Sequence, residues 1–111
     1  MKKASEVLRA VRTRLEPVDE DGEPLTLSRR YDAEGEDWKA ALPLSPKAVK
    51  WGIIGAVYAT GMPREWDLTG AIEYLRRAIS SNITIFTQDA KHEIILNRID
   101  DAIAMAERDG R

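Results

Sequence analysis

The amino-acid sequence predicts a single, mainly α-helical domain with about four helices and a small two-stranded β element. Three observations lead to this prediction. Apolar residues recur every three or four positions in several long segments, which is typical of amphipathic helices. Two short segments instead alternate apolar and polar residues, which is typical of strands. The 111 residues suffice for one domain, which we assign to residues 1–111, and an all-helical fold without the strands is the main alternative.

The first helix is predicted over residues 4–15, and Pro17 ends it because the residue before a proline disfavours helical geometry. An acidic loop at residues 16–37 follows, with nine Asp and Glu residues against two arginines. The carboxylates within 19–23 do not follow the ligand spacing of an EF-hand, so we interpret them as a solvated surface, with partner docking as the alternative. The apolar stripe of the first helix is Ala4, Val7, Leu8, Val11 and Leu15.

Residues 25–31 and 83–87 are the two predicted strands, and we expect them to pair. Both alternate apolar and polar side chains, and the second is rich in β-branched residues. A short apolar stretch lies between them, and we expect its largest side chains to anchor in the core. These expected anchors are Trp38, Ala41, Leu42 and Leu44.

A central helix is predicted over residues 46–60. Ser45-Pro46 is a suitable helix start, and Gly61 suits the left-handed position after a helix. Beyond Lys50 this segment is apolar on nearly every side, which is typical of a buried helix. Gly52 and Gly55 lower its helix propensity, so we expect another segment to pack closely against them.

Two further helices complete the prediction. One begins after the capping residue Asp67 and ends before the Ser80-Ser81-Asn82 break. The other is capped by Thr87 or Asp89 and extends to about Asp109, with Gly110 after it. Their expected core residues are Leu68, Ala71, Ile72, Leu75, Ala78 and Ile79 in the first, and Ile95, Ile99, Ala102, Ile103 and Ala106 in the second.

The sequence carries no recognisable catalytic motif. The absence of cysteine excludes a thiolate nucleophile and a cysteine-based zinc site, and there is no phosphate-binding glycine loop or nucleophile elbow. Asp89 lies three residues before His92, the only histidine, and the pair could in principle hold a metal or transfer a proton. A histidine on the surface or at a helix cap is the preferred interpretation. We therefore expect no enzymatic activity, no catalytic residue, no metal and no cofactor.

Five arginines are candidates for binding. In one interpretation, those of the first helix and two near the end of the third helix form one basic surface for an acidic partner or a nucleic acid. Solvated helix faces explain them equally well. These residues are Arg9, Arg12, Arg14, Arg76 and Arg77.

Aromatic residues supply the other binding candidates. Core anchoring is the first interpretation of Trp38, Trp51 and Trp66, and a ligand slot or an interface contact is the second. Trp66 lies in a polar connector and is expected to be the most exposed of the three. Trp38 or Phe86 would stack on a nucleotide-like ligand if the chain bound a small molecule.

Three short motifs give the chain a resemblance to known proteins. The first is the Ala4–Ala10 helix segment, and the second is Trp38 followed by a Pro-x-Ala-Val-x-Trp-x-x-x-Gly-Ala segment, here residues 46–56. The third is the extended segment 85–89 before the final helix. In this order of motifs, which covers most of the chain, it resembles a family of small bacterial and phage proteins of unknown function. It departs from that family in having Phe86-Thr87-Gln88-Asp89 where Trp-Asn-Asp is frequent, and in lacking a cysteine before the Gly-Ala pair.

These observations favour a non-enzymatic protein–protein interaction module. The resemblance implies a phage or mobile-element protein, which would bind or inhibit a host factor such as a defence complex. A binding protein for a nucleotide-like ligand is the alternative. The net charge of −2 disfavours a simple nucleic-acid binder, and the longest apolar stretch, residues 51–59, is too short to span a membrane. We expect a cytoplasmic protein, because charges interrupt the first residues too early for a secretion signal, and a homodimer through the apolar helices is a further expectation.

Overall fold

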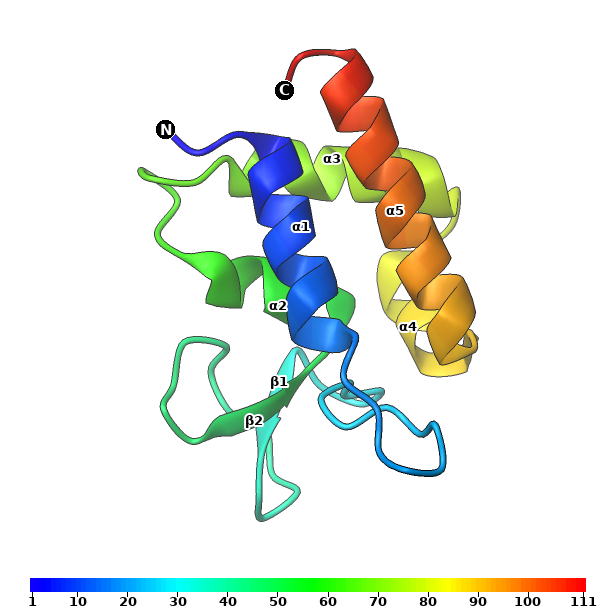
Figure 1. Cartoon of the computed structure of the whole chain (residues 1–111). Helices are drawn as coiled ribbons and strands as arrows, with labels where there is room; N and C mark the ends of the chain where they lie inside the picture. The colour runs from blue at the N-terminus through cyan, green and yellow to red at the C-terminus, as the bar shows by residue number, and fades with distance from the viewer.

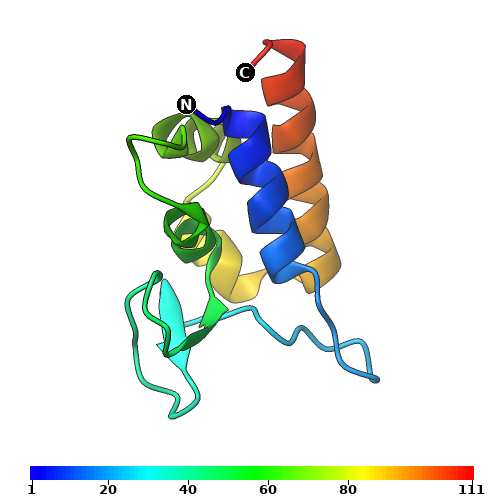
Figure 2. The same cartoon turned by 60° about the vertical axis from the view of Figure 1, so that its left-hand side comes forward.

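The computed structural model describes all 111 residues and shows five helices with a small antiparallel sheet at one end (Figure 1). The mainly α fold with a two-stranded β element is therefore confirmed, although there are five helices instead of about four. Both termini lie at the end opposite the sheet (Figures 1 and 2). The elements are α1 (Ala4–Leu15), β1 (Ala33–Gly35), β2 (Ala48–Trp51), α2 (Ile53–Thr60), α3 (Leu68–Ile79), α4 (Ile83–Asp89) and α5 (His92–Arg108).

The core forms where α1 packs against α2, α3 and α5. Helix α1 lies beside α5 in both views (Figures 1 and 2) and has the bounds that the sequence predicts. Burial of each large aliphatic side chain stabilises the fold by about 1.5–3 kcal/mol, so the apolar stripes of α1, α3 and α5 are its main source of stability. The buried stripe residues are Ala4, Val7, Leu8, Val11 and Leu15 in α1, Leu68, Ala71, Leu75 and Ile79 in α3, and Ile95, Ile99, Ala102 and Ala106 in α5.

Two predicted helix ends are confirmed. The side chain of Asp67 accepts a hydrogen bond of 3.0 Å from the amide of Gly70, which caps α3. Gly110 has the left-handed φ of 73° expected after α5. The start of α5 was predicted wrongly, because neither Thr87 nor Asp89 caps it and the helix begins only at His92.

The predicted strand 83–87 is wrong, because these residues form helix α4. The side chain of Asn82 accepts a hydrogen bond from the amide of Ile85, and the hydroxyl of Thr87 donates one to the carbonyl of Ile83. Ile83 is buried, and Phe86, three positions later, packs against the same core, so helical spacing satisfies the core where the alternating pattern would not. Without this partner, residues 25–31 form a loop whose Leu27 makes a single parallel bridge to Trp51.

The predicted helix 46–60 is also wrong in nearly its first half, residues 46–52. Residues 48–51 are strand β2, which pairs with β1 through Ala33 opposite Trp51, and only residues 53–60 are helical. Pairing with β1 satisfies backbone groups that a helix would otherwise bond, and it agrees with the strand propensity of Val49 and Trp51. Ser45 closes a local turn by accepting from the amide of Lys47, and does not cap a helix.

The helix end at Gly61 also differs from the prediction. Gly61 has an extended φ of 167° and does not adopt the left-handed conformation. A Cβ atom on Gly61 would lie 2.3 Å from Nε1 of Trp66, so this glycine is required by the indole that packs on it.

The predicted close approach to Gly52 and Gly55 is confirmed, and the approaching segment is the loop before β1. The amide of Gly52 donates a hydrogen bond of 3.0 Å to the carbonyl of Asp32. A Cβ atom on Gly55 would lie only 1.5 Å from the carbonyl oxygen of Asp32. The contact joins the sheet end of the molecule to helix α2.

Replacing Gly55 by alanine is expected to destabilise the protein by about 2–3 kcal/mol, because the methyl group would overlap the backbone of Asp32. The loss is expected even though alanine favours a helix by about 1 kcal/mol over glycine. The control is Ala104→Gly, at an exposed position of helix α5, where helix propensity alone predicts a loss of about 1 kcal/mol. Urea denaturation measures both, and a Gly55→Ala variant as stable as the wild type would contradict the close contact.

A polar contact ties the C-terminal turn to α3. Tyr74, which the predicted stripe of α3 omitted, is buried, and its hydroxyl donates a hydrogen bond of 2.7 Å to the carboxylate of Asp109. This hydrogen bond, together with desolvation, raises the pKa of Tyr74 above its ordinary value. Arg111 adds an ion pair of 3.4 Å to Asp67.

Replacing Tyr74 by phenylalanine is expected to lower stability at neutral pH and to reduce the loss of stability at alkaline pH. Because the folded pKa is raised, the contribution of Tyr74 is complete below its unfolded pKa of about 10 and is lost as the pH rises through the folded pKa. Urea midpoints at about pH 7, 9 and 11 measure this, with exposed Tyr58→Phe as the control. Equal alkaline sensitivity of wild type and Tyr74→Phe would contradict the assignment.

Candidate functional site

The segment between the two strands projects from the sheet and is held by backbone hydrogen bonds. The amide of Gly35 donates to the carbonyl of Lys39, and the amide of Ala41 donates to the carbonyl of Ala33, so β1 is flanked by chain on both edges. The indole nitrogen of Trp51 donates a hydrogen bond of 3.0 Å to the carbonyl of Pro43. These contacts fix residues 36–47, which we call the projecting segment.

The projecting segment exposes large apolar side chains, which corrects the prediction that they anchor in the core. Trp38, Leu42 and Leu44 are 68%, 77% and 57% exposed, and Ala41 is half-buried. The hydrogen bonds of β1 with residues 39–41 turn this stretch away from the helices, so apolar character alone was a misleading signal. Trp38 also has a left-handed φ of 66°, which is rare for a bulky residue.

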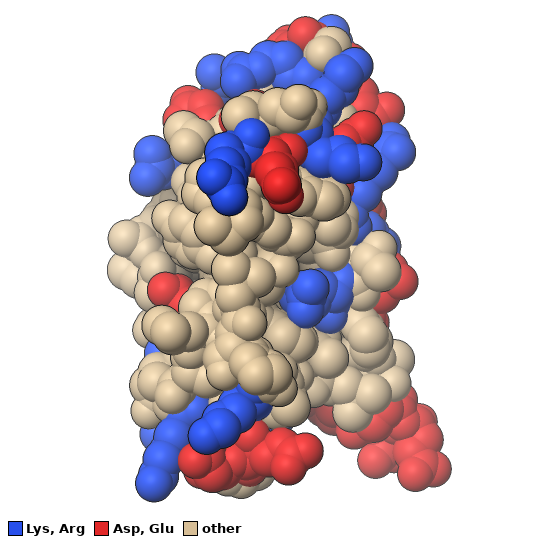
Figure 3. All heavy atoms as spheres, turned by 90° about the vertical axis from the view of Figure 1, so that its left-hand side faces the viewer, with Lys and Arg blue, Asp and Glu red and all other residues tan.

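Apolar surface continues beyond the projecting segment, which also carries the charged residues Glu36, Asp37, Lys39 and Lys47. Figure 3 shows a broad, mainly uncharged area, with a few charged side chains set in it, on the face that includes the 40–47 loop and the chain around the end of α2. Helix α2 and the segment after it add two exposed apolar side chains, Tyr58 and Met62. Charged side chains gather above and below this area in the same view, as at the rim of many protein interfaces.

A small pocket lies at the base of Trp38. Its volume is about 210 Å³, and it is lined by Glu34, Gly35, Glu36, Trp38, Val49 and Lys50. Glu34 is only 6% exposed, and its Oε2 atom is buried without a hydrogen-bond partner. The ammonium of Lys50 lies 5.1 Å from the centre of the Trp38 ring. The pocket therefore combines an aromatic face with a buried carboxylate.

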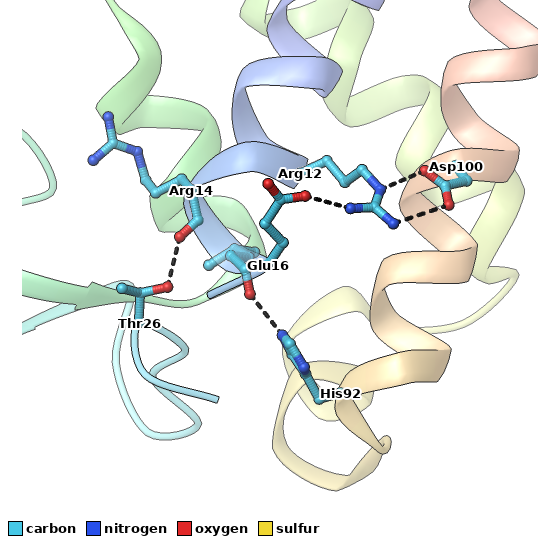
Figure 4. Close-up of polar contacts among 7 residues, drawn as sticks. Arg12, Arg14, Glu16, Thr26, His92 and Asp100 are labelled. Carbon is cyan, nitrogen blue, oxygen red and sulfur yellow. Dashed lines mark hydrogen bonds and ion pairs between the residues drawn. The ribbon is translucent and has the colours of Figure 1, made fainter. Parts of the chain in front are cut away.

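The five predicted binding arginines do not form one basic surface. Arg12 donates a hydrogen bond of 2.7 Å to Asp100 of α5, whereas Arg14 points to the other side of α1 and lies over the ring of Trp51 (Figure 4). Arg9 forms an ion pair with Glu107, and Arg77 forms one with Glu73. Arg76 lies in a different region, where it lines a shallow depression with residues 80–84 and Ile54. Most of these arginines thus have partners within the chain.

The other predicted aromatic sites are less open than Trp38. Trp66, expected to be the most exposed tryptophan, is half-buried against Gly61, with the ammonium of Lys2 at 5.6 Å from its ring centre. Phe86 is half-buried and packs against the core. Neither lines the pocket at Trp38, and none of the five candidate arginines does.

His92 contacts the C-terminal end of helix α1. Its Nε2 atom lies 2.6 Å from the carbonyl oxygen of Leu15, at the end of α1 (Figure 4), as expected of a cap-contacting histidine. The structure brings together no group of three His, Cys, Asp or Glu side chains placed to hold an ion, at the Asp89–His92 pair or elsewhere.

The acidic loop forms an ordered turn at its most acidic part. The side chain of Asp19 accepts hydrogen bonds of 2.9 Å from the amides of Asp21 and Glu23, and Val18 bridges to Pro24. The carboxylates of 19–23 lie on the surface, in agreement with a solvated loop.

Sequence reasoning missed Glu34 and Lys50 as members of a site. Glu34 lies in a run of charged and turn-forming residues, and only its pairing with β2 buries it. One signal for the exposed position of Trp38 was present, because its neighbours Asp37 and Lys39 are both charged.

Comparisons with known proteins add no assignment: no protein-family model, no curated protein and no solved structure matches this chain. The resemblance described from the sequence motifs therefore stays a prediction. None of the five helices has the length and apolar character needed to cross a membrane.

Replacing Trp38 by glycine is expected to raise stability by about 0.5–1 kcal/mol. The left-handed backbone costs a bulky residue about 1–2 kcal/mol, and the entropy of glycine offsets part of that gain. Trp51→Gly is the control, and it is expected to lose about 2–3 kcal/mol, because Trp51 is half-buried and hydrogen-bonded. Both are measured by urea denaturation, and a loss of more than about 1 kcal/mol in Trp38→Gly would show that this ring packs as a core residue.

Proposed function

We propose that this chain is a non-enzymatic protein-binding module whose contact surface is centred on the projecting segment. The observation that carries the proposal is the exposure of Trp38, Leu42 and Leu44 on a hydrogen-bonded segment. Contiguous exposed apolar surface marks sites where another protein binds, and tryptophan is among the residues that contribute most to such interfaces.

The hydrogen bonds that hold the projecting segment favour this role. A segment that is already ordered loses little conformational freedom on binding, so more of the apolar contact energy remains as affinity. The mainly uncharged face around the end of α2 lies beside it and would extend the contact (Figure 3).

The partner in this proposal is a different protein. The resemblance to small bacterial and phage proteins favours a factor of the bacterial host, such as a component of a defence complex, and the cytoplasm as the place of binding. Inhibition would then follow from occupying a surface of that factor, which requires no catalytic residue. A nucleotide-like ligand is not favoured, because Glu34 places a carboxylate beside Trp38, where a phosphate would be repelled.

Site-specific photo-crosslinking tests the proposal. A benzophenone side chain at Leu42 is expected to give a discrete cross-linked species in cells, whereas the same group at exposed Thr13 of α1 is not. Capture by the Leu42 probe should fall about 30-fold or more when Trp38 is also changed to serine, since a contact of about 2 kcal/mol is lost.

Each outcome of this experiment is decisive. Equal cross-linking from Leu42 and Thr13, or capture that does not depend on Trp38, would overturn the assignment of the surface. A species with twice the mass of the chain would show that a second copy covers this face, which would replace the heterologous partner.

A further inference from the structure

Glu34, which lines the pocket at Trp38, has an unpaired carboxylate oxygen. Its Oε2 atom is shielded from solvent and accepts no hydrogen bond. A buried carboxylate is costly unless a cation or donor accompanies it, so native proteins nearly always provide one. Oε2 of Glu34 thus lacks a positively charged or donating partner.

Lys50, the basic residue opposite Glu34 in the sheet, does not pair with the Glu34 carboxylate. The Lys50 ammonium instead lies over the ring of Trp38, at 5.1 Å from its centre. The ring face can therefore hold a cation, while Oε2 of Glu34, in the lining of the same pocket, stays unpaired.

The size and lining of the pocket restrict what it can take. Its 210 Å³ is below the usual volume of sites for drug-sized ligands, which begins at about 300 Å³. Val49, Gly35 and Trp38 provide apolar walls, Glu34 and Glu36 provide two acidic residues, and Lys50 provides the one cation, which lies over the Trp38 ring. This combination fits one long side chain with an apolar stem and a cationic tip.

We propose that this pocket binds the guanidinium group of an arginine presented by the partner protein, an inference that rests on the proposed protein-binding function. A guanidinium is planar and has five donors, so once Lys50 is displaced it stacks on Trp38 and at the same time donates to the carboxylate of Glu34. Lys50 moves off the ring when the arginine enters. Apolar residues flanking the arginine contact Leu42 and Leu44, which lie exposed on the same projecting segment.

Short capped peptides test this inference without knowledge of the partner. The first peptide is Leu-Arg-Leu, and the second replaces arginine by citrulline, which keeps the shape and removes the charge. The indole N–H resonance of Trp38 in the ¹H–¹⁵N NMR spectrum is the readout, and those of Trp51 and Trp66 are internal controls. We expect a saturable shift of Trp38 alone, at about millimolar concentration, with binding about tenfold weaker for citrulline.

Two variants assign the preference to particular side chains. Glu34→Gln keeps the shape of the carboxylate, and it is expected to remove the preference for arginine over citrulline. Lys50→Met is expected to tighten arginine binding at least about twofold, because it removes the competing cation from the ring. Unchanged Trp51 and Trp66 resonances confirm that each variant is folded.

Several results would overturn the inference. These are equal shifts with arginine and citrulline, no saturation up to about 10 mM, a preference retained in Glu34→Gln, or weaker binding in Lys50→Met. Failure here is distinguishable from failure of the protein-binding function, because cross-linking from Leu42 reports a partner whether or not that partner contributes an arginine.

Discussion

The position of the sheet on the helices depends on the contact between Asp32 and helix α2. The carbonyl of Asp32 accepts a hydrogen bond from Gly52 and lies against Gly55, where no side chain larger than hydrogen fits. The preceding loop is fixed as well, because Arg29 donates to the carbonyls of Thr87 and Ala90 at the end of α4. These contacts set the direction in which β1, and the projecting segment after it, leave the helices. The surface that we assign to binding is therefore held by backbone packing some distance from its exposed side chains.

The helices that were predicted well from the sequence are those whose apolar residues all fall on one face. In α1, α3 and α5 the apolar stripe is decided by local spacing, and the structure buries most of it, while Ile72, Ala78 and Ile103 are only half-buried. Segments 46–51 and 83–87 were predicted wrongly because their backbone conformation depends on distant partners. Residues 48–51 are strand because β1 pairs with them, and 83–87 are helical because Asn82 caps them and Ile83 and Phe86 reach the core. Local propensity is too weak to decide either case.

The candidate site was only partly predictable for a related reason. Trp38 was recognised as a binding candidate, but its exposure follows from the turn at 35–39, and the sequence pattern favoured a core position. Leu42 and Leu44 were assigned to the core on their apolar character alone. Glu34 could not be recognised, because burial of one carboxylate among nine acidic residues of the loop arises only from the pairing of β1 with β2. The five arginines were visible as charges, yet the main partners of Arg9, Arg12 and Arg14 lie far away in the sequence.

The arrangement of the chain ends has a practical consequence. The amide of Ser5 donates a hydrogen bond of 3.2 Å to the carbonyl of Arg111, so the beginning and the end of the chain meet at the pole opposite the sheet (Figure 1). A label, an immobilisation handle or a fused protein at either end would thus point away from the projecting segment. The same closeness makes the chain suitable for circular permutation, with a short linker across the old ends and new ends opened in the exposed turn at 19–23.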